Sequence, residues 1–244
     1  MAVNNDIYGE LGDRWYTAQD DPVALLRAEA RLRTGWILEL LRTHSPSPLA
    51  VLDVGCGGGF LTNPLAAAGH QVTGLDLAMD AMAVARRHDD TGRVRFLAGD
   101  ARRLPFRDGA FQVVCAMDFL EHLSERAVFL AEAARVLRPG GLFLFHTFNR
   151  NPLCHLVAIK GVEWVVRNTP KDMHVIELFM KPRELEDLCA CHGLQVQVMR
   201  GTRPRVLSRS FLKLLLTGRV DDRFQFLFTR SLLMGYCGYA RRRP

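Results

Sequence analysis

Apolar and polar residues follow two different periods along the chain. Over residues 22–41 the apolar positions recur with the spacing of an amphipathic helix. Short apolar runs then alternate with further helix-like stretches. The runs lie at 49–54, 71–76, 94–100, 111–117 and 142–148, and the helix-like stretches at about 60–69, 79–88 and 125–137. Strands that alternate with helices are typical of βαβ units, so the pattern predicts a parallel sheet with helices on both faces.

The regular alternation stops after the fifth apolar run. Residues 148–182 interrupt it, and a helix at 182–192 and two late strands near 194–200 and 232–240 follow. We therefore expect an α/β fold with a mostly parallel seven-stranded sheet. We expect residues 1–244 to form one domain, in which residues 1–48 are an N-terminal helical cover and the interruption is a lid insertion.

Charge is distributed unevenly between the two parts of the chain. The net charge of +6 combines 15 arginines against 18 acidic residues in 1–149 with 17 basic against 8 acidic residues in 150–244. A basic part can face an anionic partner, such as nucleic acid or lipid headgroups, or it can simply be solvated. The six cysteines form no CxxC pair, and the N-terminus lacks an apolar signal core. These features predict a cytoplasmic protein with reduced thiols.

The segment VLDVGCGGG, residues 51–59, predicts a ligand site. A glycine-rich turn from the first strand into the first helix lets a ligand approach the backbone, and Gly55 and Gly57 provide that access. A dinucleotide fingerprint would read G-x-G-x-x-G, but Phe60 stands where its third glycine would be. The turn therefore indicates a nucleotide-like ligand without a pyrophosphate.

Three carboxylates accompany this turn. Asp53 lies two residues before Gly55, where it suits a cationic amino group. Asp76 ends the second strand, where a carboxylate can accept both hydroxyls of a ribose, and Asp100 ends the third, within reach of an adenine amine. A ligand with an ammonium, a ribose and an adenine is S-adenosylmethionine (SAM). The sequence therefore predicts SAM binding.

At this point the chain resembles the Rossmann-like class I SAM-dependent methyltransferases, and among them the ubiquinone-biosynthesis O-methyltransferases, which methylate polyprenylated catechols and demethylated quinols. The resemblance is carried by RLRTGWI (31–37), VLDVGCGGG…VTGLD (51–76), MDFLEHL (117–123) and FNRNP…FMKPREL (148–185). It implies an enzyme whose SAM contacts fall on Arg33, Gly55, Asp76 and Met117.

The resemblance also implies a divalent cation, such as Mg²⁺, on Asp118, Glu121 and His122. Two carboxylates and an imidazole can hold such an ion. A phenol has a pKa of about 10, so a bound cation would favour the reactive phenolate. Two alternatives remain open: His122, beside Glu121, acts as a general base without metal, or the group is structural. Asp118 also departs from the family, which more often has glutamate there.

Two segments predict contact with something apolar. Residues 153–167 are too apolar for an ordinary exposed helix, and residues 205–219 place Arg205, Arg209 and Lys213 on one stripe of an otherwise leucine-rich helix. This is typical of peripheral contact with the cytoplasmic membrane. The alternative is that both segments cover the open edge of the sheet.

We expect an enzyme that methylates a phenolic hydroxyl of a prenylated catechol or quinol. A soluble aromatic secondary metabolite is the alternative acceptor. RNA is a weaker one, because the basic residues are interleaved with leucine and phenylalanine rather than with stacking aromatics.

Overall fold

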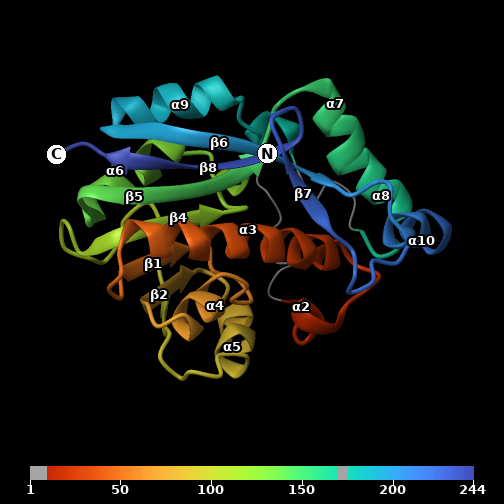
Figure 1. The fold of residues 1–244 in the computed structure, drawn as a ribbon, viewed down its shortest axis with the longest axis horizontal. Coiled ribbons are helices and arrows are strands. Elements are labelled where there is room, and N and C mark those ends of the chain that lie inside the picture. Colours follow the sequence, from red (N-terminus) through yellow and green to blue (C-terminus); the bar gives the residue numbers. More distant parts are fainter. Residues whose placement is uncertain (1–9, 170–174) are drawn as a thin grey trace.

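The computed structural model describes residues 10–169 and 175–244, and its centre is one twisted sheet (Figure 1). Five strands are parallel, in the order β3 (Arg95–Ala98), β2 (Gln71–Asp76), β1 (Ala50–Val54), β4 (Phe111–Met117) and β5 (Leu137–Phe148). The sheet continues with antiparallel β8 (Gly235–Arg242), β6 (Leu194–Pro204) and β7 (Phe226–Thr229). The predicted α/β class and mostly parallel sheet are confirmed.

The expected count of seven strands is wrong, because the described sheet has eight. The additional strand is β7, which pairs with residues 201–204 at the far end of β6. Its four residues, FLFT, are too short a run to show the alternation that marks a strand. β6 itself runs four residues beyond the predicted end, which provides the edge that β7 needs.

Helices cover both faces of the sheet. Alternate side chains of β1 point to opposite faces, so Val51 packs with α3 (Pro22–His44) and α4 (Thr62–Ala67), while Leu52 packs toward α6 (Arg126–Val136) and α9 (Pro182–Cys191). The short α5 (Met79–Arg87) packs near α2 (Arg14–Thr17) through a small cluster of its own. Both apolar faces of the sheet are thereby buried.

The long helix α3 has clear boundaries in the sequence. Asp21 accepts a hydrogen bond from the backbone N–H of Val23, and Pro22 occupies the first turn, where its missing N–H costs nothing. Ile37 and Leu41, one turn apart, are completely buried against the sheet. The opposite end of α3 carries Glu29 and Arg33, four residues apart on one face, toward the carboxyl ends of the strands.

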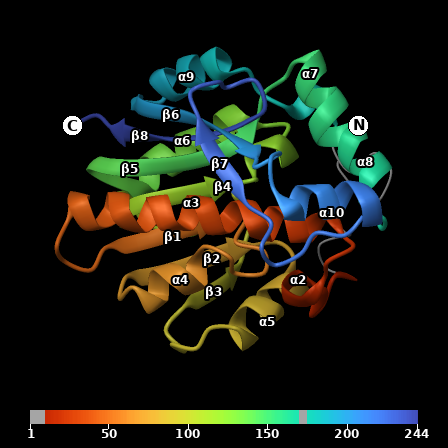
Figure 2. The same cartoon turned by 45° about the vertical axis from the view of Figure 1, so that its right-hand side comes forward.

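The segment predicted as a lid insertion lies beside a second part of the chain, and we refer to the two together as the lid. The predicted segment forms α7 (Pro152–Cys154), the π-helical η2 (His155–Lys160) and α8 (Gly161–Val165), and the second part is α10 (Arg209–Thr217). Figures 1 and 2 both show α8 and α10 together beside the start of α3. A cluster that includes Ala28, Val166 and Leu214 joins them. Residues 170–174 of the predicted insertion lie outside the described residues, and η3 (Ile176–Leu178) follows them.

The predicted helix at 205–219 is shorter than expected. Ser208 is extended and its hydroxyl accepts a hydrogen bond from the N–H of Phe211, so α10 begins at Arg209. At its other end Gly218 adopts a left-handed conformation that stops the helix. Arg205 is therefore outside the helix, and the predicted basic stripe is reduced to Arg209 and Lys213.

Candidate active site

The glycine turn after β1 forms the floor of the site. The N–H of Gly55 donates to the carbonyl of Leu75, 2.8 Å away, and the N–H of Gly57 donates to Oδ2 of Asp76, also 2.8 Å away. Both glycines have positive φ, 72° and 47°. A side chain at Gly55 would also overlap the ring of Phe119. Glycine is thus required here both by conformation and by space.

The three predicted carboxylates all line the same cavity. Asp53 is buried, and this burial, together with the nearby Asp76, raises its pKa to about 8. Asp76 is held by the amides of Gly57 and Ala78. Asp100, two residues beyond β3, forms an ion pair of 2.7 Å with Arg102, whose hydrogen bonds lower the pKa of the Asp100 carboxyl. The structure therefore brings the three carboxylates to one cavity, and that of Asp100 is paired with Arg102.

Aromatic side chains close this end of the cavity. Trp15 lies against the glycine turn, because a Cβ at Gly58 would come within 2.6 Å of its indole ring. The ring also meets Phe60 edge to face, with 5.4 Å between the ring centroids. Tyr16 donates a hydrogen bond of 2.8 Å to the carbonyl of Gly58. Our sequence reasoning missed Trp15 and Tyr16, because a four-residue helix leaves no periodic signal.

One continuous cavity of about 1130 Å³ joins the glycine turn to the lid. Its polar end includes Gly55, Asp76 and Met117. Its other end is lined by apolar side chains of α8, α10, the segment before β7 and the first residue of β7, namely Val162, Val165, Phe211, Leu214, Phe224 and Phe226. The volume is slightly above the usual range for small-molecule sites, roughly 300–1,000 Å³. It is lined to receive a polar ligand and an apolar one side by side.

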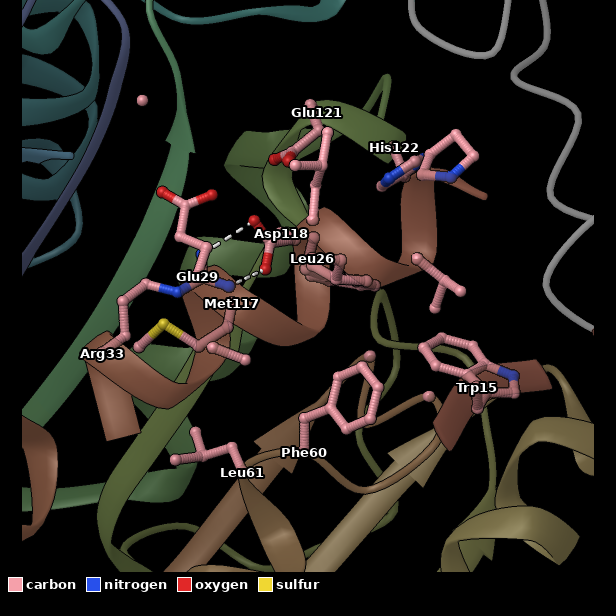
Figure 3. Close-up of a pocket in the computed structure, with 18 of the residues that line it drawn as sticks. Trp15, Leu26, Glu29, Arg33, Phe60, Leu61, Met117, Asp118, Glu121 and His122 are labelled. Carbon is pink, nitrogen blue, oxygen red and sulfur yellow. Dashed lines mark hydrogen bonds and ion pairs between the residues drawn. The ribbon is translucent and has the colours of Figure 1, made fainter. Parts of the chain in front are cut away.

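A buried cluster of charges lies where the two ends of the cavity meet. Arg33 is 2% exposed, and its two terminal nitrogens contact the two carboxylate oxygens of Asp118, with Nη1 2.8 Å from Oδ1. Nδ1 of His146 on β5 lies 2.5 Å from the same Oδ1, and its Nε2 lies 3.2 Å from Oε1 of Glu29. Figure 3 shows Arg33 and Glu29 beside Asp118.

The cluster shifts the protonation of its members. Burial disfavours the charged form of Asp118, but Arg33 and His146 outweigh it and hold the pKa of Asp118 well below its usual range. Burial and Arg33 oppose a charge on His146, whereas Asp118 and Glu29 favour it and raise the pKa of His146 to about 9. Among the described residues, Asp118 is also the one non-glycine residue with positive φ, 52°. The cluster thus holds a conformation that a lone aspartate adopts less readily.

Glu121 and His122 lie on the short turn η1 (Leu120–His122), on the other side of Asp118 (Figure 3). Glu121 is buried and accepts a hydrogen bond of 2.8 Å from the hydroxyl of Thr147. Burial and the nearby Asp118 raise the pKa of Glu121 to about 7. His122 is half-buried and, like Glu121, lines the cavity. These two candidate catalytic residues therefore share one wall.

The predicted metal ligands do not form one group. Within 10–169 and 175–244, the His, Cys, Asp and Glu side chains close enough together to hold an ion are Glu29, Asp118 and His146, not Asp118 with Glu121 and His122. The physical reason is that Asp118 turns toward Arg33. Sequence reasoning missed Glu29 because it looks like an ordinary polar position on a helix. It missed His146 because one polar residue in the apolar run LFLFHTF does not by itself indicate a partner.

Comparisons with known proteins identify the family of the chain. A family profile described as a methyltransferase domain matches residues 52–145. The ubiquinone biosynthesis O-methyltransferase of Bordetella bronchiseptica is 38% identical over 200 residues, covering 80% of each chain. The Aromatoleum aromaticum protein of the same name is 35% identical over 199 residues, covering 80% of this chain and 82% of its own.

A solved structure shows the same fold at low sequence identity. It is the magnesium protoporphyrin IX methyltransferase of Synechocystis, with bound SAH, the demethylated form of SAM. It is 16% identical, has a TM-score of 0.60, and covers 88% of this chain and 83% of its own.

Proposed function

The chain belongs to the ubiquinone biosynthesis O-methyltransferase family. We propose that this SAM-dependent O-methyltransferase methylates a phenolic hydroxyl of a prenylated catechol or demethylated quinol. The observation that carries this proposal is the continuous cavity. Its polar end suits SAM, and its apolar end, below the lid helices, suits an aromatic ring with an isoprenoid tail. A soluble aromatic without a tail would leave most of that apolar lining uncovered.

We assign the polar end to SAM as follows. Gly55 and Gly57 admit the cofactor to the backbone of the turn. Asp53 faces its ammonium group, and Asp76 accepts its ribose hydroxyls. The remaining contacts are Asp100 toward the adenine amine, Met117 against the adenosine, and Arg33 toward the methionine carboxylate.

The methyl transfer itself is an in-line displacement. The acceptor oxygen forms a bond with the methyl carbon as the bond from that carbon to sulfur breaks, so SAM leaves as the neutral thioether. The phenolic proton must go to the protein, and His122 is the acceptor we assign, with Glu121 beside it on η1. The cavity wall that carries both residues lies next to Met117 and Asp118, at the junction of the two ends.

A divalent cation does not fit the three positions that the family suggests. Both oxygens of Asp118 are engaged by Arg33, and one of them by His146 as well. We therefore derive no step through a metal ion and keep the route in which His122 acts without one.

The lid presents an apolar surface to the outside, which supports peripheral contact with a membrane. Trp164 on α8 is 72% exposed, and Leu207 and Leu216, before and within α10, are 93% and 76% exposed. Arg209 and Lys213 are exposed on the same helix. Leu215 is both exposed and part of the cavity lining, so the tail of an acceptor can pass from this surface into the cavity. In residues 10–169 and 175–244, no helix combines the length and apolarity needed to cross a membrane.

The test is methylation in vesicles. Purified protein is incubated with SAM and a reduced catechol carrying no, a short or a long prenyl tail, in anionic liposomes, and the product is measured by mass spectrometry. We expect turnover that rises with tail length and falls when Trp164 and Leu216 are replaced with serine. Equal turnover of tail-free catechol would overturn the prenylated acceptor and favour a soluble aromatic. No product with any phenol, while SAM still binds, would overturn the phenolic acceptor.

A further inference from the structure

The turn η1, which carries Glu121 and His122, is too short to fix its own orientation. Within it, the N–H of His122 donates to the carbonyl of Phe119 at 3.0 Å, and the N–H of Leu123 donates to the carbonyl of Leu120 at 3.3 Å. Ordering a single helical turn costs more backbone entropy than its hydrogen bonds return. The place of η1 in the cavity wall is therefore set by contacts with the rest of the fold.

Arg126, the first residue of α6, makes one such contact. Its Nε donates a hydrogen bond of 3.0 Å to the carbonyl of Leu120 on η1, and Nη2 of the same guanidinium donates to the carbonyl of Leu178 on η3. The side chain is half-buried. A guanidinium is planar and holds its donors in fixed directions, so one rigid group joins the two carbonyls. Arg126 thus fixes η1 relative to η3.

The far side of this bridge is firmly anchored. Phe179, directly after η3, is buried and stacks on Phe148, with 5.2 Å between the ring centroids. The N–H of Met180 donates to the carbonyl of Phe148 at 3.1 Å, and the carbonyl of Met180 accepts a bond of 2.9 Å from the hydroxyl of Tyr236. Phe148 ends β5 and lines the cavity. Through Arg126, η1 is therefore tied to the end of β5.

Other contacts keep η1 in the fold without the guanidinium. Leu120 is completely buried in the core, and Glu121 accepts the hydrogen bond from Thr147. The guanidinium acts at a different atom, the carbonyl oxygen of Leu120, and so sets the plane of the peptide group that leads into Glu121 and His122. Loss of Arg126 would leave the turn in place but free this peptide group to rotate. Arg126 lies outside the lining of the cavity, so it does not touch the ligands.

From these contacts we infer that Arg126 is a positioning residue for methyl transfer. By joining η1 to η3, it holds the imidazole of His122 where the acceptor oxygen loses its proton. The requirement is for two donors in fixed directions and not for a positive charge alone. A misplacement of about 1 Å can cost about 10²-fold in rate, so a small rotation of η1 has a large effect. The inference deepens the proposed function and rests on it, because it takes His122 as the base.

The activity test compares two substitutions at this position. Arg126→Met keeps a long stem without donors, and Arg126→Lys keeps the charge but has a single nitrogen. We expect both to lower kcat by about 10–100-fold and to leave Kd for SAM and KM for the acceptor within about twofold. Because lysine keeps the stem and the charge, this variant also tests the inference if Arg126→Met fails to fold. Full activity of Arg126→Lys, or a change confined to Kd and KM, would overturn it.

Arg242→Met is the matched control. Arg242 is also half-buried, and its guanidinium also donates to two backbone carbonyls, those of Arg135 and Leu137. These lie at the start of β5, the opposite end of the strand from the site. The control should lose stability in urea as Arg126→Met does and keep its kcat. An equal loss of kcat in the control would reduce Arg126 to a general structural role and overturn the inference.

A second measurement does not depend on methyl transfer. Hydrogen exchange of the amides of His122 and Leu123 is followed by nuclear magnetic resonance in the wild type, Arg126→Lys and Arg242→Met. We expect about tenfold faster exchange of these amides in Arg126→Lys, the effect of one lost hydrogen bond, and no change in the control. If no phenol is methylated, the proposed function fails, and exchange still decides the bridge: faster exchange supports it, and unchanged exchange overturns it.

Discussion

Replacing Gly58 with alanine tests whether Trp15 forms a fixed wall of the cofactor site. Gly58 has no positive φ, so alanine is tolerated by the backbone itself. The added Cβ would lie 2.6 Å from Cδ2 of Trp15 and 2.8 Å from its Cε3. These are distances that real contacts do not reach, so the indole ring must move away from the glycine turn.

The expected cost follows from the burial of Trp15, which is 4% exposed. Overpacking a well-packed site costs about 1–3 kcal/mol. Complete loss of a buried tryptophan costs about 3–5 kcal/mol, which sets the upper limit. We expect Gly58→Ala to lower the free energy of unfolding by about 2 kcal/mol and to weaken SAM binding, because the ring lines the cavity.

Urea denaturation and SAM titration measure the two effects. Gly35→Ala is the matched control, because a Cβ there meets nothing within 4 Å in the interior of α3. It should stabilise the protein by about 0.5–1 kcal/mol, the usual advantage of alanine in a helix. In a Trp15→Ala background the cost of Gly58→Ala should disappear. If Gly58→Ala costs as much without the indole as with it, the reasoning is refuted.

Three further predictions concern the carboxylate behind the turn, the proposed base and the lid. The unfolded chain loses the proton of Asp53 near pH 3.8 and the folded chain near pH 8, so the free energy of unfolding should fall as pH rises between these values. Asp53→Asn should flatten this slope in urea titrations, and an unchanged slope would contradict the assignment. His122→Ala should lower kcat by about 10²–10⁴ with little change in Kd for SAM, and a mainly weakened Kd would point to a structural role. Ser208→Ala should destabilise the protein by about 1 kcal/mol through loss of the α10 cap, whereas exposed Ser231→Ala should not; equal effects would rule out the cap.

The sequence predicted the parallel half of the fold well because its signals are local. Each strand from β1 to β5 is an apolar run bounded by turn residues, and the glycine turn is recognisable from the five consecutive residues GCGGG. Local patterns cannot reveal contacts between charged side chains that are far apart in the sequence. Glu29 and His146 are 117 positions apart, and neither has a spacing that links it to Asp118. The contact appears only once α3 is packed across the ends of β4 and β5.

In the lid, too, the sequence predicted the kind of surface but not the helix boundary. Composition indicated an apolar surface, and several of its side chains are exposed, but composition could not locate the start of α10. That boundary depends on one hydroxyl, that of Ser208, bonding to one backbone amide. A serine between arginines and leucines gives no indication of whether it caps a helix or continues one.

The position of β8 has a consequence for how the protein is made. It follows every other described strand in the sequence, yet it lies inside the sheet, between β5 and β6. Since the chain is synthesised from its N-terminus, β6 and β7 emerge before the strand that attaches them to β5. A nascent chain that has not reached Gly235 therefore carries a parallel half-sheet with an uncovered edge at β5. A translation product that stops short of this strand would lack an interior strand of the sheet and not an edge strand. We expect such a product to be bound by chaperones or degraded by proteases, and not to act as a slower enzyme.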